Sequence, residues 1–184
     1  MRILAVSGSL RAESYNTALV RAAQELAPEG VDLELYDNLA ALPPYDADAD
    51  GEDPPAAVFD LRARIAAADA LLLVTPEYNG SIPGVLKNAV DWASRPHREA
   101  ALWGKTVAVA GATTGQYGAL WAQQDLRRVL GIASARVIDG DLPVARAQNA
   151  FDENGRLRDP VVAERLRAHL ATLVAEAAPV ALAA

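Results

Sequence analysis

A dense group of hydrogen-bonding side chains lies between residues 7 and 16, directly after the first apolar segment of the chain. Hydroxyls, an amide and a guanidinium occur here just before a predicted helix, whose N-terminus favours anions through its free N–H groups and dipole. A guanidinium can also bind a phosphate through two parallel hydrogen bonds. The segment therefore predicts a site for a phosphate monoester, formed by Ser9, Arg11, Ser14 and Asn16. For Ser14 alone, simple capping of the helix is an equally good interpretation.

A second group of informative residues lies between residues 75 and 92. Pro76 and Pro83 stiffen this segment, whereas Gly80 and Gly84 let its backbone come close to a ligand or a neighbouring element. The free N–H and C=O groups of such a turn can contact the edge of a planar heterocycle, and Tyr78 can flank it. Taken alone, the segment is better explained as an ordinary strand-to-helix loop with one aromatic anchor, because a single aromatic residue in a loop is common.

Length and charge limit the classes of protein to which the chain can belong. Its 184 residues fit a single domain spanning residues 1–184, and about half of them are apolar, which is enough for a real core. The net charge is −7, and no basic stripe with interleaved aromatic residues is present. We therefore expect no nucleic-acid partner, and an acidic surface that keeps the protein in solution.

The absence of cysteine excludes disulfides, thiolate nucleophiles and thiolate-bound metals. No metal site is expected. No segment approaches the roughly 20 consecutive apolar residues that a membrane span needs, and the first ten residues are too few for a signal peptide and are better explained as a strand. We expect a cytoplasmic protein with no membrane partner.

Short β-branched segments alternate with longer alanine-rich helical segments along the whole chain. Such alternation predicts an α/β fold, a doubly wound five-stranded parallel sheet with helices on both faces. In this architecture ligands bind beyond the carboxyl ends of the strands, where the two polar segments lie. The expected strands are 3–7, 31–36, 70–75, 106–110 and 135–138, and the expected helices are 15–27, 56–68, 85–94, 119–130 and 160–177.

Two long loops and a few isolated residues complete the pattern. Loops 38–55 and 140–158 show no clear periodicity, and loops of this length are often functional or lie at an interface. We expect His97 and His169 to be surface residues without a role. Three tryptophans are expected in the core or at an interface: Trp92, Trp103 and Trp121.

Three segments carry a resemblance to a known family. Residues 7–16 resemble the GSxRxxSxN signature of the NADPH-dependent FMN reductase family, and residues 76–92 are very similar to its PEYNxSxPGxLKNAxDW stretch. Residues 111–127 resemble its glycine-containing loop and the helix that follows, although Ala112 stands where relatives often carry serine. The similarity covers nearly the whole chain and implies a flavodoxin-like, FMN-binding domain.

This resemblance also implies a role for particular residues. It implies contacts to the phosphate and ribityl groups of FMN from Ser9, Arg11, Ser14, Tyr15 and Asn16. It further implies contacts to the isoalloxazine ring from Pro76, Glu77, Tyr78 and Asn79, with Thr113 and its loop on the other side of the ring. No side chain is expected to act as a catalytic acid or base.

The implied activity is that of an NAD(P)H-dependent oxidoreductase that reduces quinones or other electron-poor small molecules. Hydride would pass from NADPH or NADH to bound FMN and then to the acceptor, in a ping-pong mechanism. The family also implies a homodimer or homotetramer, with loop 38–55 near the partner subunit. Two alternatives stay open: a flavodoxin-type electron carrier that does not use NAD(P)H, and a flavin-bound interaction protein without turnover.

Overall fold

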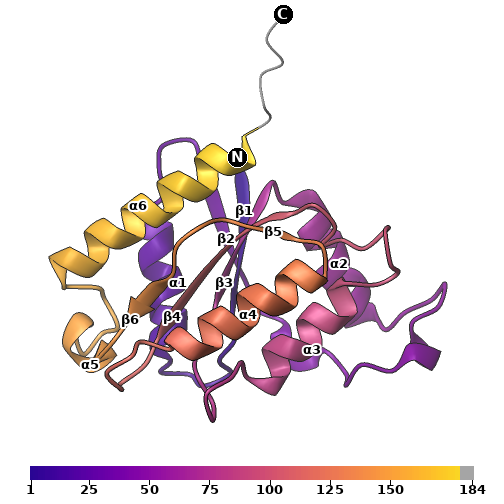
Figure 1. The fold of residues 1–184 in the computed structure, drawn as a ribbon, viewed down its shortest axis with the longest axis horizontal. Coiled ribbons are helices and arrows are strands. Elements are labelled where there is room, and N and C mark those ends of the chain that lie inside the picture. Colours follow the sequence, from indigo (N-terminus) through magenta and orange to yellow (C-terminus); the bar gives the residue numbers. More distant parts are fainter. Residues whose placement is uncertain (179–184) are drawn as a thin grey trace, which may run out of the picture.

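The computed structural model describes residues 1–178, which form a parallel sheet covered by helices (Figure 1). The strand order is β2-β1-β3-β4-β5, and a short strand, β6, pairs with the far end of β4. All pairings between named strands are parallel, and this order is the flavodoxin-like one. The strands are β1 (Arg2–Ser7), β2 (Asp32–Tyr36), β3 (Ala70–Val74), β4 (Thr106–Ala112), β5 (Arg136–Val137) and β6 (Leu142–Val144).

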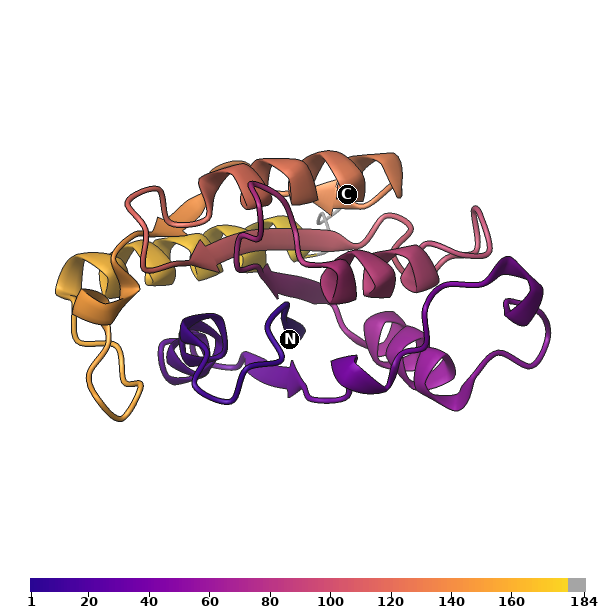
Figure 2. The same cartoon turned by 90° about the horizontal axis from the view of Figure 1, so that it is seen from below.

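Helices cover both faces of the sheet, as Figures 1 and 2 show from two directions. One face packs against α1 (Tyr15–Glu25) and α6 (Pro160–Ala177), and the other against α2 (Ala56–Ala67), α3 (Gly84–Ala93) and α4 (Leu120–Ile132). The remaining helical segments are short: α5 (Ala147–Ala150) and two 3-10 turns at Leu39–Ala41 and Ala47–Ala49. The expected doubly wound fold is confirmed.

Alternation along the central strands produces the two cores. In β3, Leu72 and Val74 face α1 and α6, whereas Leu71 and Leu73 face α2, α3 and α4. Every residue of β3 is buried, as expected for a parallel strand with helices on both faces. Beyond Thr106 at its start, the side of β4 that faces α1 and α6 carries only alanines, which lets these helices approach closely: Ala108, Ala110 and Ala112.

The structure adds elements that periodicity did not predict. Loop 140–158 contains β6 and α5, which are too short to produce a recognisable sequence pattern. Loop 38–55 contains both 3-10 turns and is fastened to α3, because Asn88 and Trp92 each donate a hydrogen bond of 2.8 Å to the carbonyl of Pro43. Within residues 1–178, no helix is long and apolar enough to cross a membrane.

The expectation that His169 is a surface residue is wrong. Its side chain is 8% exposed, and its Nε2 lies 3.0 Å from the carbonyl oxygen of Val109 in β4. The neighbouring edge strand is interrupted at this level, because β5 ends at Val137 and β6 begins only at Leu142. His169 therefore donates to a carbonyl that a continuous edge strand would have paired.

The three tryptophans differ from one another in exposure. Trp92 of α3 is fully buried against loop 38–55, and its ring packs edge-on against Tyr45 at 4.9 Å. Trp103 and Trp121 are each nearly half exposed. Of the three tryptophans, only Trp92 is therefore a core residue.

Candidate functional site

The first polar segment follows β1 as a loop and then enters α1. The loop is fixed at its start, where Gly8 donates to the carbonyl of Val74 at 2.8 Å, so it leaves the sheet beside the end of β3. Within the described residues, the backbone N–H groups of five positions ahead of α1 donate no hydrogen bond: Ser9, Leu10, Ala12, Glu13 and Ser14. A row of unpaired N–H donors ahead of a helix N-terminus fits an anion.

Ser14 caps α1, as the alternative interpretation of the sequence predicted. Its hydroxyl oxygen accepts from the backbone N–H groups of Asn16 at 3.2 Å and Thr17 at 3.5 Å. Ser14 is buried, and its own hydroxyl hydrogen is free to donate. Capping and a hydrogen bond to a ligand are therefore compatible at this residue.

Asn16 is buried and connects the first loop to β4. Its side-chain nitrogen donates to the carbonyl of Ala112 at 3.0 Å, and its side-chain oxygen accepts from the N–H of the same residue at 2.9 Å. This amide pair joins α1 to the end of β4, across 96 positions of sequence. The structure thus gives Asn16 a positioning role, and a direct contact to a ligand stays a prediction.

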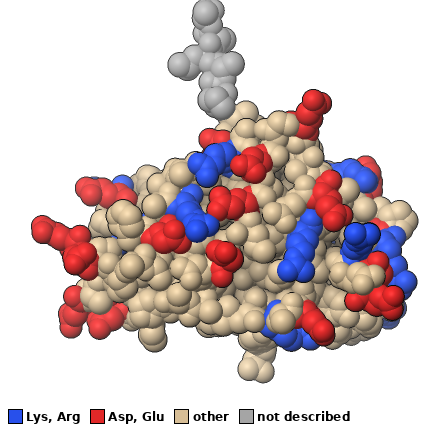
Figure 3. Space-filling model, turned by 180° about the vertical axis from the view of Figure 1, so that it is seen from behind, with Lys and Arg blue, Asp and Glu red and all other residues tan. Residues whose placement is uncertain are grey.

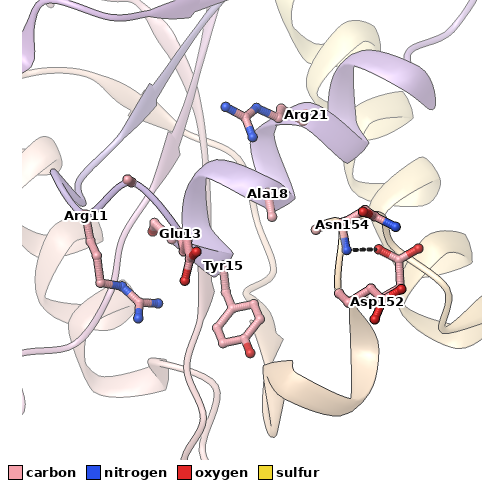
Figure 4. Close-up of a pocket in the computed structure, with 11 residues that line it drawn as sticks. Arg11, Glu13, Tyr15, Ala18, Arg21, Asp152 and Asn154 are labelled. Atoms are coloured by element: carbon pink, nitrogen blue, oxygen red, sulfur yellow. Dashed lines mark hydrogen bonds between the residues drawn. The ribbon is translucent and has the colours of Figure 1, made fainter.

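Arg11 and Tyr15 lie together at the outer side of the loop. The Arg11 guanidinium carbon is 6.0 Å from the centre of the Tyr15 ring, within the range of a cation–π contact. Figure 4 shows both residues beside Glu13, facing the turn that carries Asp152 and Asn154. A cavity of about 340 Å³ separates the two sides, and the residues described as lining it include none from segments 76–81 or 113–118.

The second polar segment forms a tight turn after β3. Asn79 and Gly80 have positive φ angles of 53° and 76°, and Tyr78 and Ser81 exchange backbone hydrogen bonds of 3.0 and 3.1 Å across them. Positive φ at both central residues defines a type I′ turn, for which Asn-Gly is a favoured pair. The turn holds Tyr78 with its side chain 53% exposed.

Pro76 and Glu77 lie at the base of this turn. Pro76 is buried, and its carbonyl accepts a hydrogen bond of 2.7 Å from the Thr75 hydroxyl. The Glu77 carboxylate accepts from the backbone N–H of Ala122 at 3.2 Å, in the first turn of α4. No side chain of α4's own N-cap supplies this cap, because Ala119 occupies that position.

The third segment, residues 113–118, connects β4 to α4. The backbone N–H of Thr113 donates to the carbonyl of Val144 in β6 at 3.1 Å, and the carbonyl of Thr113 accepts from the N–H of Ala147 in α5 at 3.0 Å. Gly118 has φ +60°, and a Cβ there would lie 2.7 Å from the backbone nitrogen of Val144, so only glycine fits. The loop ends on two half-exposed aromatic rings with centroids 4.8 Å apart, those of Tyr117 and Trp121.

The ten predicted site residues therefore lie on the three loops that follow β1, β3 and β4 or, for Tyr15 and Asn16, on the first turn of α1. These strands are adjacent and parallel, so their carboxyl ends meet at one edge of the sheet. The unpaired N–H row after β1 suits a phosphate, and the exposed turn after β3 suits the edge of a planar ring. These donors fit FMN, an anionic phosphate joined to a flat heterocycle.

Sequence reasoning missed the contacts among these loops. Pairings such as Glu77 with Ala122 join residues far apart in sequence, and no spacing rule reports them. Tyr117 could have been identified, because an aromatic residue in a glycine-rich loop after a buried strand is a recognisable signal.

Charges of both signs are mixed over the face shown in Figure 3, where acidic and basic side chains lie side by side. Several charged side chains of the described residues form ion pairs, including Arg64 with Glu34 and with Asp60, at 2.6 and 3.0 Å. Exposed pairs of this kind contribute little to stability. Because charges of both signs are mixed and the net charge is −7, an anionic ligand must be bound by local groups.

The strand order β2-β1-β3-β4-β5, with polar loops after β1 and β3, places the chain in the class of flavodoxin-like α/β proteins. Residues 1–149 match the family model described as NADPH-dependent FMN reductase. The chain belongs to this family, and it is accordingly an oxidoreductase with FMN and NAD(P)H as cofactors.

Relatives of known activity cover almost the whole chain. An NAD(P)H-dependent FMN reductase of Pseudomonas aeruginosa is 43% identical over 174 residues, covering 94% of this chain and 93% of the relative. A 2-hydroxy-1,4-benzoquinone reductase of a Burkholderia species is 38% identical over 175 residues, covering 95% and 92%. The solved structure of FerB, an NAD(P)H:acceptor oxidoreductase of Paracoccus denitrificans, is 34% identical with a TM-score of 0.84 and 96% of each chain covered.

Proposed function

We propose that this chain is an NAD(P)H:quinone oxidoreductase that binds FMN at the edge of the sheet described above. The observation that carries the proposal is the row of unpaired backbone N–H donors after β1, beside the exposed turn at residues 78–81. The family match supports it, as do relatives named quinone reductase in Pseudomonas putida and Escherichia coli.

Nine of the ten predicted site residues have a proposed task in binding, and Asn16 positions the first loop against β4. Arg11, with the N–H groups and the hydroxyls of Ser9 and Ser14, binds the phosphate, and Tyr15 supports Arg11. The turn at residues 76–79 contacts one edge of the ring, and Thr113 with its loop lies at the other side. When bound, FMN supplies the redox chemistry, accepting a hydride from NAD(P)H and passing electrons to the acceptor.

We further propose that NAD(P)H and the acceptor use the same face of the bound ring in turn, because the three loops meet at one edge of the sheet and offer a single site. Such ping-pong kinetics predict parallel lines in double-reciprocal plots. Intersecting lines, together with a ternary complex, would contradict this part of the proposal.

The activity is tested by steady-state oxidation of NADPH and NADH against a panel of quinones, ferricyanide and free FMN. Acceptor-dependent oxidation, faster with quinones than without any acceptor, is the expected result. A chain that binds FMN but does not oxidise NAD(P)H would instead be an electron carrier or a flavin-bound interaction protein.

The chain as a whole is proposed to act as a single FMN-binding domain in the cytoplasm, where NAD(P)H is available. We propose a homodimer or homotetramer, which exposed apolar residues such as Trp121 and Ile132 of α4 support. Light scattering at micromolar concentration tests the assembly, and a monomer with full activity would overturn it.

A further inference from the structure

The turn after β3 is joined to α4 by two hydrogen bonds that end on carboxylates. In the first, the Glu77 carboxylate of the turn accepts from the Ala122 backbone N–H at 3.2 Å. In the second, the Ser81 hydroxyl of the turn donates to the Asp125 carboxylate of α4 at 2.5 Å. The two contacts lie on successive turns of α4, so they restrain both the position and the direction of the loop.

The surroundings of the two carboxylates suit these contacts. A carboxylate near a helix N-terminus is stabilised by the positive end of the dipole, and Ala119 leaves the α4 N-terminus without a side-chain cap of its own. The hydrogen bond from Ser81, together with Arg128 at 2.6 Å, holds the pKa of Asp125 below its usual range. Asp125 therefore stays ionised at neutral pH and keeps accepting from Ser81.

The two parts joined in this way carry exposed aromatic side chains. Tyr78 stands on the turn, and Trp121 stands on the first turn of α4, next to the residue that Glu77 caps. A planar ring at the edge of the sheet would meet the turn and this end of α4 together. The position of the turn relative to α4 then decides how well a flat ligand fits.

We propose that Glu77, Ser81 and Asp125 form a clasp that locks the 76–81 turn onto α4 and so sets the geometry in which the isoalloxazine ring is bound. Ser81 and Asp125 are positioning residues in this account, acting through the turn without touching the ring. The inference rests on the proposed function, because it assumes that the ring lies against the turn.

The clasp is tested with Ser81→Ala, which removes one hydroxyl and leaves the backbone bonds between Tyr78 and Ser81 in place. Losing a hydrogen bond to a charged group at the ring-binding turn should weaken FMN binding about tenfold. The visible absorption bands of bound FMN should also move toward those of free FMN, a change that a general loss of stability does not produce. Ser81→Thr keeps the hydroxyl and should recover most of the affinity.

Ser94→Ala is the matched control. The Ser94 hydroxyl also donates a partly buried hydrogen bond, to the Asp91 carbonyl at 3.0 Å. Ser94, however, lies at the C-terminal end of α3, whereas the turn precedes its N-terminal end. This control should leave FMN affinity and spectrum unchanged. In the cofactor-free chain, a double-mutant cycle of Ser81→Ala and Asp125→Ala should show non-additive losses of unfolding free energy, since the two residues share one bond.

The possible outcomes distinguish a failure of the proposed function from a failure of the clasp alone. A parent chain that binds no FMN overturns the proposed function, and the inference with it. A parent chain that binds FMN, with a Ser81→Ala variant of equal affinity and identical bound spectrum, overturns the clasp alone. An additive cycle, or an equal effect of Ser94→Ala, likewise overturns the clasp.

Discussion

Asn16 is the single side chain on which the candidate site depends most strongly for its shape. Its amide pairs with both backbone groups of Ala112, and all of these atoms are buried. Asn16→Ala leaves one buried N–H and one buried C=O unpaired, which should lower the free energy of unfolding by about 2–4 kcal/mol. Chemical denaturation measures the loss. Asn154→Ala, at an exposed position, is the control and should change stability little.

Arg11 is expected to affect cofactor binding and hardly stability. It is exposed and contacts only the Tyr15 ring at 6.0 Å among the interactions described. Arg11→Ala should weaken FMN binding by ~1.5–3 kcal/mol, roughly ten- to a hundredfold. Arg11→Lys keeps the charge but loses the planar fork, so it should recover part of the loss.

The assay for Arg11 combines an FMN fluorescence titration with turnover at saturating FMN. Turnover of Arg11→Ala should return close to the parent value once FMN saturates the site. Unchanged FMN affinity, or turnover that stays low at saturation, would show that Arg11 has a different task.

Sequence reasoning at this scale located residues better than it assigned their contacts. The polar motif after the first strand placed Ser14 and Asn16 correctly at the start of α1. It did not reveal that Asn16 is already paired with Ala112, because that contact spans 96 positions. Local patterns report local hydrogen bonds, such as the cap by Ser14, and long-range pairs require the folded chain.

Among the secondary-structure elements, α6 bonds to the sheet where its edge strand is interrupted, because His169 of α6 donates to the Val109 carbonyl of β4. Burial lowers the pKa of His169, and Arg127 and Arg165 lower it further, whereas the bond to Val109 and the charge of Asp141 raise it. The folded chain therefore binds a proton at His169 less readily than the unfolded chain, whose histidine pKa is about 6.5. Stability should be unaffected above that pH and should fall as the pH drops below it.

Thermal unfolding between pH 7.5 and 5 tests this prediction. His169→Gln can still donate to the Val109 carbonyl but cannot titrate, so it should lose less stability on acidification than the parent. His97→Gln, at an exposed position, should behave like the parent. Equal acid sensitivity of His169→Gln and the parent would contradict the assignment.

Element-scale prediction succeeded where the periodic signal was long. The five main strands and five main helices were all located, and in all of them except β5 the apolar spacing persists over five or more residues. Strand β6, with only Leu142–Val144, is too short for such a signal. The role of His169 was hidden for the same reason, since it depends on the gap between two short edge strands.

For the molecule as a whole, the central claim is that three loops at one edge of the sheet form an FMN site. The strand order brings the three loops to this edge, and membership of the FMN reductase family supplies the cofactor. The claim depends on no particular acceptor and on no particular assembly. It can therefore be tested separately from both.

The most direct test is the stoichiometry of FMN on the purified chain. The protein is incubated with excess FMN, passed through a desalting column, and its flavin and protein contents are measured from absorbance after denaturation. This account predicts a yellow protein with one non-covalently bound FMN per chain, released unchanged on unfolding. A colourless protein that retains no flavin, and that quenches no FMN fluorescence in titration, would contradict it.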